Sequence, residues 1–429
     1  MKFILKGNII YNKTPNSLNI IPQGYLICTE GISGGVFTEI PQEYLDYPLI
    51  DYGDKLILPG LIDLHLHAPQ YTFRGMGMDL ELLDWLNTYT FREEAKYNGL
   101  DYAHKAYDLF VEDMVKGATT RAAVFGTIHR PATLLLMEKL ERAGLVSYVG
   151  KVNMDRNSPP YYVEENATKS LEETEKFIEE ALEKFSRSKP ILTPRFTPSC
   201  SDELMEGLGK LQRKYNLPVQ SHLSENPKEI AWVEELSPGI RCYGDSYHRY
   251  GLFGGEGVPT IMAHCVWPVE IEEQMLKDHG IYVAHCPGSN SHLSSGIAPI
   301  RRFLDKGIKV ALASDIAGGT ETNILRAMAD AISMSKMYWR LLDPEDSPLT
   351  VPEVLYMATI GGGSFFGRVG SFEEGYELDA IIIDDSSFHN TEDFTIENRL
   401  ERLIYLGDEE QVYEKYIKGH KVKEFKSEK

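Results

Sequence analysis

The sequence has no Cys-x-x-Cys pair, no long apolar run and no excess of positive charge. Its five cysteines are odd in number and widely spaced, which disfavours a disulfide framework and favours free thiols in a reducing compartment. No stretch approaches the roughly 18 apolar residues that cross a bilayer. The N-terminal MKFILKGNIIY is interrupted by Lys6 and Asn8 and has no signal-peptide cleavage site. These absences predict a cytoplasmic protein.

Positive charge is in the minority: the chain has 44 lysines and arginines but 64 aspartates and glutamates, which gives a formal net charge of −20. Such a field repels phosphate backbones and anionic lipid surfaces. Nucleic acid polymers and membranes are therefore poor candidate partners, whereas a small neutral base remains open as a substrate. A hydrophobic content of 42% with 25% charged residues is typical of a globular enzyme and argues against a disordered chain.

The hydrophobic pattern changes near residue 59 and again near residue 371. The first fifty-odd residues alternate short β-prone runs with proline and glycine, as antiparallel strands do. Between 59 and 371, short apolar runs alternate with helix-period segments, and short strands return afterwards. This predicts an α/β fold: a catalytic (β/α)₈ TIM-like barrel of the metal-dependent hydrolase type at 59–371, with a small β-sandwich domain formed by 1–58 and 372–429.

Eight apolar runs are the candidate barrel strands, and several are hydrophobic throughout, as buried parallel strands are. One intervening segment, 170–185, has the spacing of an amphipathic helix, with an apolar face that includes Phe177 and Leu182. The predicted strands span residues 60–67, 118–126, 146–152, 190–196, 218–224, 260–265, 281–287 and 310–315.

Two histidines, His65 and His67, end the first predicted strand. Residues two apart in a strand point to the same side, so both imidazoles face one space. The ends of barrel strands form the C-terminal face, where active sites are built. An isolated His-x-His pair is more often structural, but this pair occurs together with three further side chains that can bind a metal. His222, His264 and Asp315 also lie at or near the ends of predicted strands, and all five would meet at one barrel mouth.

Three histidines and an aspartate are a borderline-to-hard ligand set that suits Zn²⁺, with Fe²⁺ as the alternative. Glu225 follows His222 by three residues and is placed to act as a proton shuttle. Hydrolytic deamination needs water ionised near neutral pH, a protonated ring nitrogen and a protonated leaving amine, and one carboxylate beside the metal can serve all three. Asp315 would both bind the metal and accept a proton from water, and His264 would contact the attacking oxygen.

The series PGLIDLHLH, QSHLSE, MAHC, AHCPGSN and SD resembles the amidohydrolase superfamily, specifically its aminohydrolase branch. HAPQYTFRG (67–75), LTPRFTPSC (192–200) and QSHLSENPKEI (220–230) resemble its guanine-deaminating members. The resemblance implies an enzyme that converts guanine to xanthine and ammonia in purine catabolism or salvage, one zinc per subunit and a homodimer. It implies metal ligands His65, His67, His222 and Asp315, catalytic residues Glu225, Asp315 and His264, and purine contacts Gln70, Arg195, Phe196, His222, Glu225 and His264.

The sequence can also be compared with four other classes of protein. A binuclear amidase would need a carboxylated lysine at the end of strand four, where this chain has Arg195. An aminohydrolase acting on cytosine, an adenosine derivative or a triazine would share the metal ligands but should lack the pair formed by Gln70 and Arg195. The unrelated zinc nucleobase deaminases need a Cys-x-x-Cys motif. A non-catalytic scaffold on the same barrel would have lost ligands, and none is missing.

Overall fold

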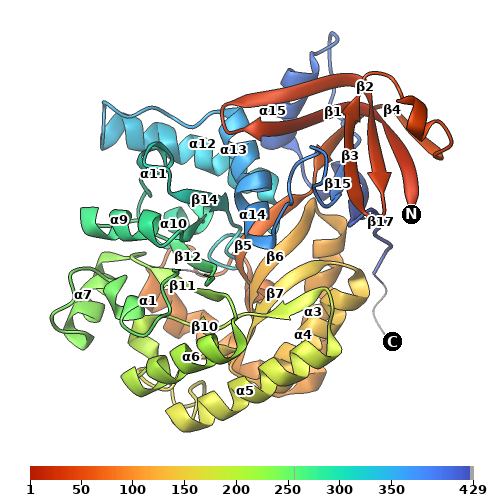
Figure 1. Cartoon of the computed structure of the whole chain (residues 1–429). Helices are drawn as coiled ribbons and strands as arrows, with labels where there is room; N and C mark the ends of the chain where they lie inside the picture. The colour runs from red at the N-terminus through yellow and green to blue at the C-terminus, as the bar shows by residue number, and fades with distance from the viewer. Residues whose placement is uncertain (256, 426–429) are drawn as a thin grey trace.

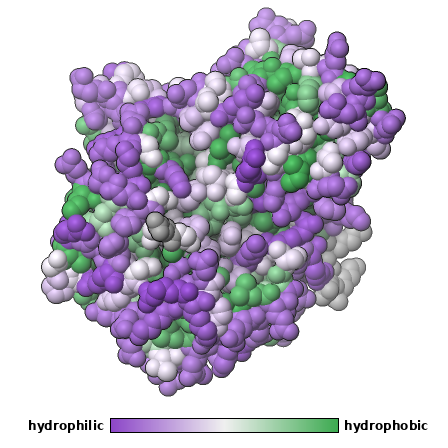
Figure 2. All heavy atoms as spheres, in the orientation of Figure 1, coloured by the Kyte–Doolittle hydropathy of each residue, from purple (hydrophilic) through white to green (hydrophobic). Residues whose placement is uncertain are grey.

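The computed structural model describes residues 1–255 and 257–425. Its parallel strands lie inside a layer of helices, and a second sheet built from both ends of the chain lies beside them (Figure 1). The predicted fold class, an α/β barrel accompanied by a small β region, is confirmed. Hydrophilic residues cover most of the face drawn in Figure 2, and hydrophobic residues occur in separate patches, as the large net charge implies.

Each predicted barrel strand is present, and every pairing between the barrel strands is parallel. The third and fourth predicted strands are each interrupted, so that they appear as two short strands. The barrel strands are β5 (Leu61–His67), β6 (Thr119–Phe125), β7 (Val146–Gly150), β8 (Val152–Asn153), β9 (Ser188–Pro190), β10 (Thr193–Pro194), β11 (Val219–Leu223), β12 (Thr260–His264), β13 (Tyr282–His285) and β14 (Lys309–Leu312).

Backbone hydrogen bonds outside the regular ladders join the strand groups into a closed ring. A parallel bridge between Leu192 and Val219 links the fourth strand to β11. On the other side, the amide of Asp315 donates to His65 O at 2.9 Å, and the amide of His67 donates to Ile316 O at 3.0 Å. Closure therefore runs directly through the candidate metal ligands and brings the first and last strand ends together.

The outer helices follow the barrel strands as predicted, with one difference in α5 (Ala167–Lys184). Its buried stripe runs through Ser170, Thr174, Phe177 and Ala181, while Leu182 is 52% exposed. The other barrel helices are α3 (Leu100–Lys116), α4 (Arg130–Ala143), α6 (Asp202–Tyr215), α7 (Pro227–Leu236), α8 (Asp245–His248), α9 (Glu270–Asp278), α10 (Pro287–His292), α11 (Ile300–Asp305), α12 (Ile324–Leu341), α13 (Val351–Tyr356) and α14 (Gly362–Phe366). No helix among the described residues is long and apolar enough to cross a membrane.

A helical insertion between β5 and α3 lies at the C-terminal end of the barrel. It consists of the 3₁₀ helix η2 (Ala68–Phe73), α1 (Leu82–Trp85), the π-helical turn η3 (Leu86–Thr90), α2 (Phe91–Ala95) and the 3₁₀ helix η4 (Lys96–Asn98). Single π turns inside helices occur frequently at functional sites. This one sits next to the candidate active site.

Strands from both chain ends form one seven-stranded sheet of order β17-β16-β15-β4-β1-β2-β3. It has a small hydrophobic core of its own, which includes Leu5, Ile9, Ile57, Phe372 and Ile382. Residues 426–429 of the predicted 372–429 segment lie outside the described residues. The elements are β1 (Lys2–Thr14), β2 (Ser17–Thr29), β3 (Ile32–Phe37), β4 (Leu49–Pro59), β15 (Ala380–Ile383), β16 (Val412–Ile417) and β17 (His420–Lys421), with α15 (Ile396–Leu406) beside them.

Candidate active site

The structure brings the predicted metal ligands together at the barrel mouth. Nε2 of His65 lies 3.1 Å from Asp315 Oδ1, and Nε2 of His67 lies 3.4 Å from the same oxygen. Nε2 of His222 lies 3.3 Å from Nε2 of His67. All four side chains are buried.

These three distances suit a metal ion, and the potential ligand atoms form two overlapping groups within 4.8 Å, His65 with His67 and Asp315, and His65 with His222 and His264. Ligand atoms held about 2.0–2.1 Å from a tetrahedral zinc lie roughly 3.3–3.4 Å from one another. Nδ1 of His65 and Nδ1 of His67 have no hydrogen-bond partner among the described residues, and Nε2 of His65 has Asp315 Oδ1 as its neighbour. Burial lowers the pKa of His65, His67 and His222, which favours the neutral imidazoles that metals bind. Buried imidazoles without hydrogen bonds are costly unless they bind something.

Hydrogen bonds fix which nitrogen of His222 faces the centre. Nδ1 of His222 lies 2.6 Å from the carbonyl oxygen of Arg195. A carbonyl only accepts, so Nδ1 carries the hydrogen and Nε2 is left as the metal-facing lone pair. The backbone carbonyl of Arg195 thus orients the candidate ligand His222, while the side chain of Arg195 lines the neighbouring pocket.

His264 and Asp315 have left-handed backbone conformations, with φ of +73° and +48°. Such conformations cost non-glycine residues about 1–3 kcal/mol each and cluster at functional sites. Nε2 of His264 lies 3.4 Å from Glu225 Oε2 and 3.8 Å from Asp315 Oδ2. Burial opposes ionisation of Asp315, but the neighbouring histidines hold the pKa of this carboxyl below its ordinary value. Conversely, the pKa of His264 is raised because Glu225 and Asp315 outweigh its burial.

Glu225 is buried beside this cluster, and burial raises its pKa to about 7. Its Oε1 accepts a hydrogen bond from Ser295 Oγ at 3.0 Å. Its backbone amide donates to Glu229 Oε2 at 3.1 Å. Glu229 was not singled out in the sequence, although the spacing from Asn226 to Glu229 before an apolar run is that of a capping box, which the structure forms at the start of α7.

One pocket contains all of the sequence-predicted site residues except His65, which is fully buried beneath it. Leu82 of α1 and Leu86 of η3 supply an apolar wall of this pocket. No role was predicted for either leucine from the sequence. The pocket is lined by His67, Gln70, Leu82, Leu86, Arg195, Phe196, His222, Glu225, Glu229, His264 and Asp315.

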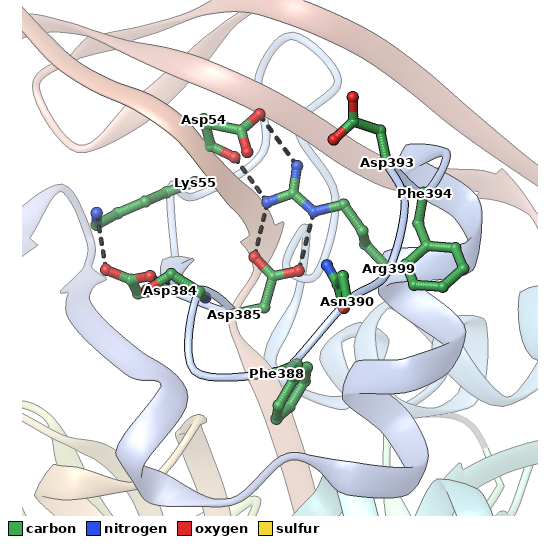
Figure 3. A pocket seen from close by; sticks show the side chains of 10 residues that line it. Asp54, Lys55, Asp384, Asp385, Phe388, Asn390, Asp393, Phe394 and Arg399 are labelled. Atoms are coloured by element: carbon green, nitrogen blue, oxygen red, sulfur yellow. Dashed lines mark hydrogen bonds and ion pairs between the residues drawn. The ribbon is translucent and has the colours of Figure 1, made fainter.

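A larger cavity of about 490 Å³ lies away from this site, between the terminal sheet and α15 (Figure 3). Five of its charged side chains are engaged with each other: Arg399 binds Asp385 and Asp54, and Lys55 binds Asp384. None of its lining residues is a histidine or a cysteine. These ion pairs connect β4 to the segment after β15 and to α15, so they are structural.

The fold and the convergent side chains define a class of protein: a barrel enzyme with a candidate metal centre at the C-terminal ends of its strands. Residues 56–422 match the amidohydrolase family model, and the chain belongs to that family. It is 37% identical to a guanine deaminase of Dictyostelium discoideum, an alignment that covers 98% of each chain.

Solved structures agree with this assignment. A guanine deaminase from C. acetobutylicum with bound guanine superposes with a TM-score of 0.96 at 46% identity, covering 99% of this chain and 100% of that one. An adenosine deaminase from Xanthomonas campestris with bound zinc shares the fold, with a TM-score of 0.83 at 20% identity, covering 100% of this chain and 94% of that one.

Proposed function

We propose that this enzyme is a guanine deaminase, which hydrolyses guanine to xanthine and ammonia. One observation carries the proposal: the side chains of Gln70 and Arg195 line the same pocket as the histidine and aspartate cluster. A guanidinium and an amide N–H suit the acceptor atoms O6 and N7 of guanine. Similarity to guanine deaminases over nearly the whole chain supports the same substrate.

Purine binding is assigned to Gln70, Arg195 and Phe196, assisted by His222, Glu225 and His264. Phe196 is only 7% exposed and forms an edge-on pair with Trp232 at 6.2 Å between ring centroids, so it is a rigid apolar wall. Leu82 and Leu86 offer a second apolar surface for the flat base.

Zinc is the metal we assign to His65, His67, His222 and Asp315, with Fe²⁺ as the alternative. When bound, it supplies a Lewis acid that makes water nucleophilic near neutral pH. Glu225 takes a proton from the attacking water and delivers it to the ring nitrogen beside C2. The hydroxyl now on C2 then gives its proton through Glu225 to the exocyclic amine, and the bond between C2 and that amine breaks, which releases ammonia and leaves xanthine. Burial raises the pKa of Glu225, which suits a carboxyl that must both accept and donate protons near neutral pH.

The test is an ultraviolet assay of purified, metal-replete protein with guanine, adenine, cytosine and a triazine. We expect turnover of guanine, with one zinc or iron per chain by metal analysis. Chelation should abolish activity, and zinc should restore it. Protein that ignores guanine but deaminates cytosine or a triazine would overturn the substrate assignment. Two metals that are both needed for turnover would overturn the mononuclear site.

Two further assignments accompany this function. The chain is proposed to divide into a small β domain of residues 1–58 and 372–429 and a catalytic barrel of 59–371. A separate core beneath the terminal sheet supports this division, and limited proteolysis that leaves one of the units intact would test it. The enzyme is also proposed to be a cytoplasmic homodimer, which sedimentation and cell fractionation would test.

A further inference from the structure

Glu94 is a fully buried carboxylate that lies behind the pocket wall. It belongs to α2, has no exposed surface and is absent from the pocket lining. Its Oε1 accepts a hydrogen bond from Gln70 Nε2 at 2.7 Å, and its Oε2 accepts one from Arg195 Nη1 at 2.6 Å. One side chain therefore holds both of the polar groups that we assign to purine recognition.

The amide of Gln70 is fixed at both ends. Its Oε1 accepts a hydrogen bond from the backbone amide of Ala317 at 3.0 Å, while its Nε2 donates to Glu94. A flipped amide would place its NH₂ group against the Ala317 amide and its oxygen against the Glu94 carboxylate, so both contacts would become repulsive. Only the second N–H of Nε2 is left without a partner among the described residues.

The guanidinium of Arg195 is fixed in the same way. Nη1 binds Glu94 and lies 3.9 Å from Met154 Sδ. The guanidinium lies 5.1 Å from the ring centroid of Phe91, which belongs to α2, the helix that also carries Glu94. Burial lowers the pKa of Arg195, but the carboxylate of Glu94 outweighs this and raises the pKa above its ordinary value. Within the described part of the chain, Nη2 and Nε have no partner, so they remain available as donors.

From this arrangement we infer that Glu94 is a positioning residue that makes this pocket wall a pure hydrogen-bond donor surface, and that it thereby selects 6-oxo purines over 6-amino purines. The inference rests on the proposed function. A wall that presents only N–H groups is satisfied by the O6 and N7 acceptors of an oxopurine. The exocyclic amine of adenine would face another donor and leave buried groups unpaired.

The test variant is Glu94→Gln, which keeps the shape but replaces one acceptor oxygen with an NH₂ group. Either Gln70 or Arg195 then faces a donor. If Gln70 does, each orientation of its amide has one repulsive contact, with residue 94 or with the Ala317 amide, so the flipped form that turns an oxygen toward the pocket is no longer excluded. The matched control is Glu93→Gln, the same change at the adjacent position of α2. Glu93 binds Thr72 and Lys96 and does not line the pocket.

We expect Glu94→Gln to raise KM for guanine at least about tenfold while kcat changes less than about threefold, the pattern of lost binding that does not depend on the transition state. The inhibition constants of adenine and hypoxanthine give the sharper readout. Their ratio, adenine over hypoxanthine, should fall at least about tenfold in Glu94→Gln and stay at the wild-type value in Glu93→Gln. Metal content should be unchanged in both variants.

Wild-type KM and an unchanged inhibitor ratio in Glu94→Gln would overturn the inference. So would a parallel rise of both inhibition constants, because loosened packing alone does not discriminate between the two purines. If Glu94→Gln does not fold, Glu94→Asp keeps the charge but shortens the reach, and the same two outcomes decide. Wild-type protein that does not deaminate guanine would overturn the proposed function instead, and calorimetric binding of hypoxanthine and adenine to both variants would still decide the role of Glu94.

Discussion

Individual residues at the barrel mouth are held by partners distant in the sequence. Ser295 donates to Glu225 from the loop after α10, and Arg195 O orients His222. Burial raises the pKa of Glu225, although the Ser295 hydrogen bond and His264 oppose the rise, and the Ser295 contact holds the carboxyl near His264. A single substitution at Glu225 therefore tests proton transfer separately from metal binding.

Glu225→Gln retains size and hydrogen bonding but removes the base. We expect kcat to fall at least about 10²–10⁴-fold, the scale of general acid–base catalysis. Zinc content should stay near one per chain, because the four assigned ligands are unchanged. Steady-state kinetics together with metal analysis measure both quantities. Wild-type activity would move the proton-transfer role to Asp315.

Arg195→Met tests substrate recognition at the same scale. The unmodified enzyme should bind guanine far more tightly than adenine, which acts as a competitive inhibitor, because adenine presents an amine where guanine presents O6 and unmade polar contacts in a buried site are costly. The substitution should raise KM and lower kcat/KM for guanine while the metal remains bound. Competition between the two bases measures the ratio of their affinities, and a variant with unchanged discrimination would contradict the assignment.

The sequence predicted that the four assigned ligands lie close together, because they stand at or just after the ends of apolar strands, and strand ends meet at one barrel face. It did not predict Glu94 or Glu229. Both are single acidic residues on helices, and their role depends on what lies across the pocket. The strained backbones of His264 and Asp315 were equally invisible, since positive φ at a non-glycine residue reflects tertiary contacts that outweigh local preference.

At the scale of elements, the segment of residues 75–90 forms the apolar side of the pocket. Its Leu82 and Leu86 line the pocket, and Trp85 Nε1 donates to Met76 O at 3.0 Å. No secondary structure was predicted for the sequence LLDWLNTYTF (82–91), which holds both leucines. The π turn within it was not predictable, because a π turn differs from an α turn only by a shift in hydrogen-bond partners.

Gly75 and Gly77 both have positive φ and precede α1, so alanine substitutions at the two positions can be compared directly. A Cβ on Gly77 would lie 2.5 Å from Tyr89 Cε2 and 3.1 Å from Trp85 Cδ1, whereas a Cβ on Gly75 would have no neighbour within 4 Å. Gly75→Ala should cost about 1–2 kcal/mol from its backbone conformation alone and leave KM unchanged. Gly77→Ala should also displace the helix and raise KM for guanine about tenfold or more. Thermal unfolding and kinetics on both variants measure this, and equal KM values would contradict a role for the segment in binding.

At the scale of the whole molecule, buried ionic contacts tie the terminal sheet to the barrel. Arg121 of β6 binds Asp379 with two hydrogen bonds of 2.6 and 3.0 Å, and Asp379 precedes β15. Lys415 of β16 donates to three backbone carbonyls at the end of α3 and the start of β6. The alternation of short strands and turns predicted a terminal β region. It did not predict these contacts, because each joins residues more than 250 positions apart.

Arg121→Met should strongly destabilise the protein. Arg121 is 2% exposed and the side chain of Asp379 has no exposed surface, so removing the cation leaves a buried carboxylate without its charged partner. Such losses cost about 3–5 kcal/mol. The control is Arg326→Met on α12, whose side chain is 63% exposed and whose partner Asp330 lies four residues along the same helix, so the expected loss is about 1 kcal/mol or less. Chemical denaturation measures both free energies of unfolding. Adding Asp379→Asn to Arg121→Met should recover much of the loss, because the penalty arises from the stranded charge, and a double variant as unstable as the single one would show that the contact acts through packing instead.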